Sequence, residues 1–122
     1  MAEIKTTAGT VVHVDAGGIS VLTLGTGGTV LGGLGEQVTT AEAPEALLAR
    51  LSLTKGFARL TRPDGSALWV KGAAVSLVRE PLATEVPPDG TVKAVVLAGG
   101  HYAVSEDVRT AMAWINANGG AL

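Results

Sequence analysis

The residues of this sequence best suited to chemistry are two histidines, one of which has a carboxylate two positions away. His13 and Asp15 would share a face of a β-strand, where a carboxylate can orient an imidazole ring. The second histidine, His101, follows two glycines in a distant segment. Neither has a neighbouring nucleophile or a third ligand, so we expect no catalytic residue and no metal site. An enzyme using His13 or His101 is the least favoured alternative.

A glycine-rich segment, residues 25–33, is the second candidate, because glycine-rich loops cradle phosphate groups. A P-loop needs a lysine after its last glycine, and no lysine lies between Lys5 and Lys55. The dinucleotide-binding fingerprint needs a third glycine where Val30 stands, and a helix opening at that point. We therefore expect a tightly packed hairpin here and no bound cofactor.

The third candidate is a local excess of positive charge near Phe57 and Trp69. Such a patch can bind single-stranded nucleic acid through phosphate contacts and base stacking. Aromatic residues make up only 3% of the chain and the formal net charge is -2, so nucleic-acid binding is kept as an alternative. The residues that would make these contacts are Arg50, Lys55, Arg59, Arg62 and Lys71.

The elements that carry these residues follow one plan twice. Segments 4–51 and 59–115 both read as a glycine-turned hairpin, a further apolar strand, a second hairpin and an amphipathic helix. Matching residues are 56 apart through the first strands and 64 apart after a long loop near residues 81–90. The pattern predicts an α+β fold made of a duplicated strand-rich module. Each copy would have about four to five antiparallel strands followed by one α-helix, with repeats 1–52 and 53–122 packed as one pseudo-twofold domain.

Local signals predict where these elements begin and end. Pro63-Asp64-Gly65 predicts a turn between two strands. Segment 91–97 predicts a central strand, because it is apolar on both faces. Thr39 with Glu42 predicts a capping box for the first helix, and Ser105 is the expected N-cap of the second.

Composition bounds the class of protein. The chain has 122 residues, of which 47% are hydrophobic and 16% charged, and it has no cysteine. So low a charged fraction fits two interpretations equally: part of the surface is covered by another copy or by a partner, or the chain is simply a small soluble protein rich in alanine and glycine. The first residues lack the basic and apolar regions of a secretion signal, so we expect a cytoplasmic protein, or a virion-associated one if a phage encodes it. Three aromatic residues are expected to anchor the core or an interface: Trp69, Tyr102 and Trp114.

The second half resembles a small bacterial flagellar-operon family, FlbD. The resemblance rests on segments 58–62, 64–65, 75–79 and 99–106, where the family has a turned hairpin, a strand and a glycine-led strand that enters a helix. His101 stands where the family has a lysine, and the first half joins the resemblance only through the internal repeat. The resemblance implies an accessory protein that acts through protein contacts near motility machinery.

The sequence therefore favours a non-catalytic module for protein–protein interaction or structural assembly, a component of a bacterial or phage assembly that forms homo-oligomers. Single-stranded nucleic-acid binding and a small enzyme remain the two alternatives.

Overall fold

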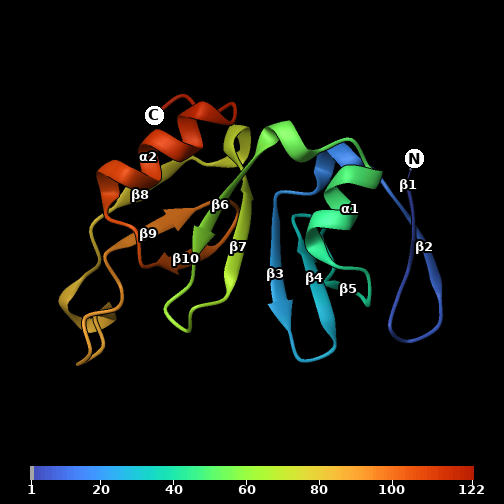
Figure 1. Ribbon diagram of the computed structural model, residues 1–122, viewed down its shortest axis with the longest axis horizontal. Coiled ribbons are helices and arrows are strands. Elements are labelled where there is room, and N and C mark those ends of the chain that lie inside the picture. Colours follow the sequence, from blue (N-terminus) through green and yellow to red (C-terminus); the bar gives the residue numbers. More distant parts are fainter. Residues whose placement is uncertain (1) are drawn as a thin grey trace.

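The computed structural model describes residues 2–122 and shows a mixed α+β fold. Those residues form ten β-strands in three antiparallel sheets and two α-helices, which confirms the α+β part of the predicted fold class. The molecule is elongated, with one helix in each half and the first hairpin at the end that carries the N-terminus (Figure 1).

The first half holds five strands followed by a helix. In chain order these are β1 (Ala2–Lys5), β2 (Val11–Val14), β3 (Val21–Gly25), β4 (Gly28–Gly32), β5 (Val38–Thr40) and α1 (Pro44–Arg50). A 3₁₀ turn, Ala16–Gly18, joins β2 to β3. The glycine-rich segment forms the expected hairpin, since β3 pairs with β4 from Val21 opposite Gly32 to Gly25 opposite Gly28.

The second half holds five further strands and a helix. These are β6 (Phe57–Thr61), β7 (Ala67–Lys71), β8 (Leu77–Arg79), β9 (Ala94–Leu97), β10 (His101–Val104) and α2 (Val108–Ala117). Three 3₁₀ turns lie at Thr54–Gly56, Gly72–Ala74 and Ala83–Glu85. The turn predicted at Pro63-Asp64-Gly65 is confirmed, with Gly65 at φ 89° between β6 and β7. The central strand predicted over residues 91–97 is confirmed over its last four residues, β9, which lies between β10 and β8; residues 91–93 are not part of it.

Strand pairing joins the two halves. One sheet is the hairpin β1-β2, the second has the order β10-β9-β8, and the third has the order β5-β4-β3-β7-β6. In the third sheet β3 pairs with β7, placing Val21 opposite Val70 and Leu22 opposite Trp69. We call this β3–β7 pairing the internal junction.

The internal junction is not reciprocal. A twofold arrangement of the halves would also pair β8 with β2, because in a twofold contact each partner offers both surfaces. No such pair occurs in the sheets formed by residues 2–122. The strand pairing therefore departs from the pseudo-twofold packing expected from the sequence.

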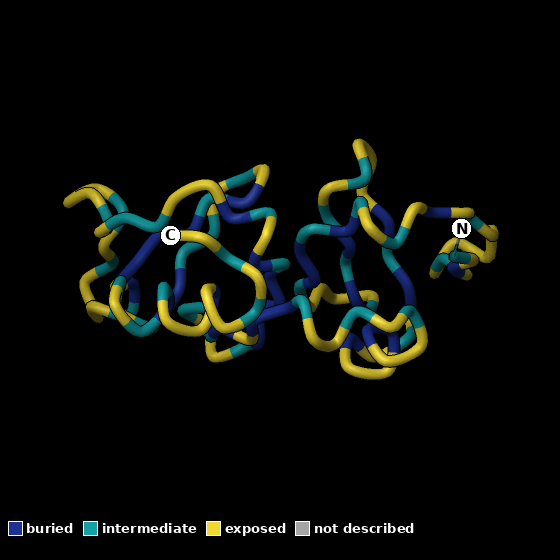
Figure 2. The backbone as a smooth tube through the Cα atoms, turned by 90° about the horizontal axis from the view of Figure 1, so that it is seen from above, coloured by how far each residue is buried: buried dark blue, intermediate teal, exposed yellow. Residues whose placement is uncertain are grey.

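Two apolar cores lie on opposite faces of the junction. Since successive strand residues point to opposite faces, β7 sends Leu68 and Val70 into one core and Ala67 and Trp69 into the other. The first core includes Ala111 and Ile115 of α2. The second includes Leu22, Leu31 and Leu47 of the first half. Buried backbone accordingly runs inside both halves (Figure 2).

Both predicted helix caps are wrong. Thr39 lies in β5, and α1 begins after Ala43, which makes no side-chain cap. Asp107, not Ser105, caps α2: its carboxylate accepts the Thr110 backbone N–H at 2.8 Å, which holds the pKa of Asp107 below its ordinary value. Ser105 instead donates its N–H to the Thr61 carbonyl at 2.8 Å. Thr39 thus takes part in strand pairing, and Ser105 in a backbone bond to β6, where sequence alone assigned both to helix starts.

A search of residues 2–122 finds no helix with the length and apolar character needed to span a bilayer.

Candidate functional site

The three aromatic residues expected at an interface lie in three different environments. Trp69 is only 7% exposed and packs inside the chain at the internal junction, opposite Leu22. Tyr102, on β10, is half-buried and packs against the core of the second half. Trp114 is 45% exposed on α2. The structure therefore does not bring them together into one patch, and Trp69 joins the two halves to each other.

The basic residues spread over several elements, and two of them have partners. Arg50, at the end of α1, forms an ion pair with Glu42 at 3.0 Å, which raises the arginine pKa. Lys71 donates its Nζ to the Gly17 carbonyl at 2.7 Å. Lys55 and Arg62 flank β6, whose five residues span roughly 15 Å.

The stacking surface beside these charges is largely covered. The Arg59 guanidinium lies 5.6 Å from the centroid of the Trp69 ring, within the range of a cation–π contact. Because Trp69 is buried, it leaves little ring face for a nucleic-acid base. The arrangement can attract phosphate through exposed charges, but it offers poor stacking.

The histidines lie in opposite halves of the chain. His13 is exposed on β2, and His101 is exposed on β10. Asp15 does not orient His13: its carboxylate accepts the Gly17 backbone N–H at 3.0 Å and caps the 3₁₀ turn after β2. Within residues 2–122 no three histidine, aspartate or glutamate side chains are arranged to hold a metal ion.

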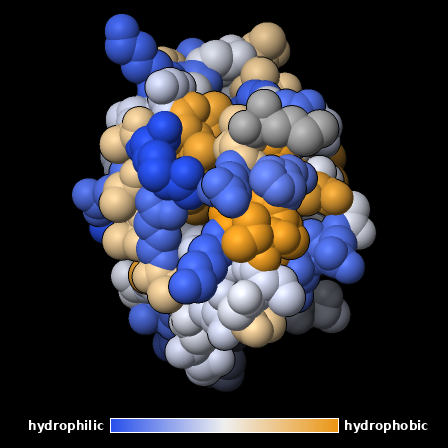
Figure 3. All heavy atoms as spheres, turned by 90° about the vertical axis from the view of Figure 1, so that its right-hand side faces the viewer, coloured by the Kyte–Doolittle hydropathy of each residue, from blue (hydrophilic) through white to orange (hydrophobic). Residues whose placement is uncertain are grey.

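Exposed apolar side chains gather near two strands that the sequence did not single out. Val11, on β2, is 49% exposed, and Leu77, on β8, is 42% exposed. Leu82 and Val86 are also exposed, in the loop that follows β8. Apolar atoms lie among hydrophilic ones at the centre of the end of the molecule that carries β2 (Figure 3). The two strands lie toward opposite ends of the long axis (Figure 1).

These same two strands present open sheet edges. β2 pairs only with β1, and β8 pairs only with β9, so each offers unpaired backbone groups on its other side. The strands β1, β5, β6 and β10 also lie at sheet edges, but a backbone hydrogen bond links β5 to the turn after β1, and another links β6 to the residue after β10. The Thr7 N–H bonds the Thr39 carbonyl at 2.9 Å, and the Ser105 N–H bonds the Thr61 carbonyl at 2.8 Å.

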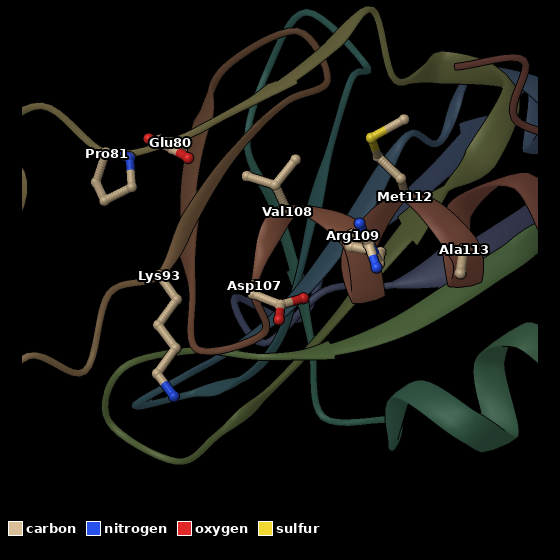
Figure 4. A pocket seen from close by; sticks show the side chains of 8 residues that line it. All are labelled: Glu80, Pro81, Lys93, Asp107, Val108, Arg109, Met112 and Ala113. Carbon is tan, nitrogen blue, oxygen red and sulfur yellow. The ribbon is translucent and has the colours of Figure 1, made fainter.

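A groove of about 940 Å³ lies beside β8 (Figure 4). Glu80 and Pro81 line it from the segment that follows β8, and Val108 and Met112 line it from successive turns of α2. Charged side chains also border the groove, among them Lys93 and Asp107. Its apolar floor and charged rim suit a protein segment better than a small reactive substrate.

An ion pair organises the loop after β8. Arg79 and Glu85 lie 2.7 Å apart in a two-pronged contact, and the Leu82 N–H also donates to the Glu85 carboxylate at 2.7 Å. Hydrogen bonding to Arg79 is the main cause that lowers the pKa of Glu85 to about 2. The loop therefore leaves β8 in a fixed direction.

The fold and these surfaces define the class of the molecule as an antiparallel α+β domain with two open sheet edges. No protein-family model, no curated protein and no solved structure matches the chain.

Proposed function

We propose that this chain is a non-catalytic assembly module that works by self-association or by docking to a larger protein assembly, such as a bacterial or phage one. The internal junction carries the proposal. There a strand of one half adds to a sheet of the other and buries Trp69, so pairing of strand edges is already how this chain joins its own parts.

We further propose that the halves are two copies of one structural plan that follow each other in tandem along the chain. The register of the hairpins supports this. Ile4 lies opposite Val12 in the first half, and Leu60 lies opposite Leu68 in the second, a spacing of 56 residues on both strands. The hairpin turns also close with matching hydrogen bonds, from the Thr6 N–H to the Thr10 carbonyl and, 56 residues later, from Arg62 to Ser66.

The three-stranded parts support the same proposal. Leu22 pairs with Leu31, which pairs with Val38; in the second half Val78 pairs with Val96, which pairs with Tyr102. Both halves also share the order of two strands, a 3₁₀ turn, three strands and a helix, with one further 3₁₀ turn, Ala83–Glu85, between β8 and β9. The FlbD-like resemblance of the second half fits an accessory protein of this kind and would extend to the first half through the repeat.

Light scattering on a concentration series tests the proposed function. We expect a species larger than a monomer at micromolar concentration, with an average mass that rises with concentration. A constant monomer mass across the series, together with no binding to any purified assembly from its host, would contradict the proposal.

Single-stranded nucleic-acid binding is a second candidate, favoured by the exposed Arg59 on β6 and the exposed Lys55 just before it. Filter binding of single-stranded DNA at two salt concentrations tests it, because phosphate contacts weaken steeply with salt. Retention that is absent, or that does not change with salt, rules this candidate out.

A further inference from the structure

We propose that a second copy of this chain binds through strand pairing between β2 of one copy and β8 of the other. This inference rests on the proposed function and on the proposed repeat. It names the partner, the two strands and their register. This pairing would form, between two molecules, the same kind of contact as the internal junction, which β3 and β7 form within one molecule.

The register follows from the spacing of 56 residues between the halves. In the internal junction Val21 lies opposite Val70 and Leu22 opposite Trp69. The positions that correspond to β3 lie on β8, and those that correspond to β7 lie on β2. The equivalent contact places Leu77 opposite Val14, Val78 opposite His13 and Arg79 opposite Val12.

The backbone groups needed for this contact are free on both strands. On β2, every second residue hydrogen-bonds to β1, and the bond from the Thr6 N–H to the Thr10 carbonyl fixes which residues these are. His13 is not one of them, so its N–H and C=O point away from β1. On β9, residues bond alternately to β10 and to β8, and the bond from the Ala98 N–H to the Gly100 carbonyl fixes which residues bond to which strand. Val78 therefore points its N–H and C=O away from β9.

Leu77, at the proposed contact, and Val11, next to it on β2, are exposed, whereas their counterparts in the other half are buried. Leu77 is 42% exposed, whereas Val21, its counterpart at the internal junction, is 1% exposed. Val11 is 49% exposed, whereas its counterpart Ala67 is 6% exposed. Docking of a second copy would cover Leu77, in the way the internal junction covers Val21.

The groove beside β8 provides the space that the incoming hairpin needs. In the first half, Leu48 of α1 is buried in the core that contains Phe57 and Trp69. Its counterpart, Met112, is only half-buried and lines the groove. The groove (Figure 4) thus lies where the first half accommodates the hairpin β6–β7, and the outer face of β1–β2 from a second copy would fill it.

The two surfaces differ, so the contact is head-to-tail. Each molecule that joins uses one β2 edge and one β8 edge and leaves one of each open, which generates a filament or a closed ring. His13 replaces the Trp69 of the internal junction, so less apolar surface is buried and the association is reversible.

Two proline variants test the contact. His13→Pro and Val78→Pro each remove an outward N–H while leaving the bonds to β1 and β9 in place. Each variant alone should be monomeric at concentrations where the wild type associates. An equimolar mixture should form a dimer and nothing larger, because each variant keeps the edge that the other lacks. Circular dichroism and the melting temperature check that both variants fold.

Cysteine pairs test the register without proline, and the chain contains no cysteine of its own. Leu77→Cys mixed with Val14→Cys should give a disulfide-linked dimer, since opposite residues in a non-hydrogen-bonded pair lie about 4.5 Å apart at Cα. The matched control mixes Leu77→Cys with Val12→Cys. Those residues would be diagonal neighbours about 7–8 Å apart and should not crosslink.

Each remaining outcome overturns the inference. Association of either proline variant as strong as that of the wild type means that other surfaces make the contact, and it leaves the proposed function standing. A dimer of His13→Pro alone indicates symmetric pairing of β8 edges, and a dimer of Val78→Pro alone indicates symmetric pairing of β2 edges. A wild type that stays monomeric, with no disulfide between the Leu77→Cys and Val14→Cys variants, overturns this inference and the self-association part of the proposed function, and leaves docking to a larger assembly to its own test.

Discussion

Replacement of Trp69 by alanine should destabilise the protein more than the same change at any exposed aromatic position. Trp69 is 7% exposed and lies in the core beside Leu22 and Phe57, so its removal leaves a cavity at the internal junction. Such truncations cost about 3–5 kcal/mol. The cation–π contact with Arg59, at 5.6 Å, accounts for about 0.5–1 kcal/mol of this range.

This energy converts into a large change in melting temperature. With an unfolding entropy of about 2.1 cal/mol/K per residue, a 122-residue chain shifts its Tm by about 4 °C for each kcal/mol. We therefore expect Trp69→Ala to lower the Tm by about 12–20 °C in a calorimetric scan. The scan should be run at a low protein concentration, so that dissociation of oligomers does not contribute.

His13→Ala is the matched control, because His13 holds the equivalent position on β2 and is exposed. Its effect should stay within about 0.5 kcal/mol. A loss of less than about 1 kcal/mol in Trp69→Ala, or equal losses in both variants, would refute the argument that the internal junction holds the two halves together.

Three further predictions concern stability. Thr29→Val should cost about 1–3 kcal/mol in urea unfolding, because the buried Thr29 hydroxyl donates to the Glu42 carbonyl at 2.7 Å; Thr29→Ser should restore most of the loss. Gly72→Ala should cost about 1–3 kcal/mol, since an added Cβ would collide with backbone carbonyls at the end of α2; no loss in a thermal melt would contradict this. Glu85 contributes stability that is fully present above its ordinary pKa of 4.5 and is lost as the pH falls toward its folded value of about 2. Urea unfolding between pH 5 and pH 2 should therefore show a steeper loss in the wild type than in Glu85→Gln, and parallel curves would exclude the ion pair with Arg79 as a source of stability.

The sequence predicted the local elements well because their signals are local. Alternation of apolar residues and glycine turns placed the hairpins and the central strand β9. The helix caps failed for a physical reason. Ser105 has a side chain suited to capping, but its backbone is held by a hydrogen bond to Thr61 from a distant strand. The helix α2 begins two residues further on, where the Asp107 side chain caps it, and no local pattern records the bond between Ser105 and Thr61.

The internal junction could have been found from one feature of the sequence. Residues 67–70 are all apolar and all buried, which is typical of a strand covered on both faces. That feature predicts a central strand with neighbours on both sides, and it would have placed Trp69 inside the chain. The open edges of β2 and β8 could not be predicted from either strand alone, because an edge is defined by which strand is absent beside it.

The differences between the halves concentrate at the positions where we propose that copies meet. His13 stands in place of Trp69, and a loop of residues 80–93 follows β8 where two residues join β3 to β4. The first difference weakens an external contact relative to the internal one, because it lowers the apolar area buried; the three residues of β8 match the three residues of β3 that pair with β7. Covalent linkage of the halves also removes the entropy cost of bringing them together, which the external contact must meet in full. The internal junction should therefore remain closed at any protein concentration, while contacts between molecules form and break as concentration changes.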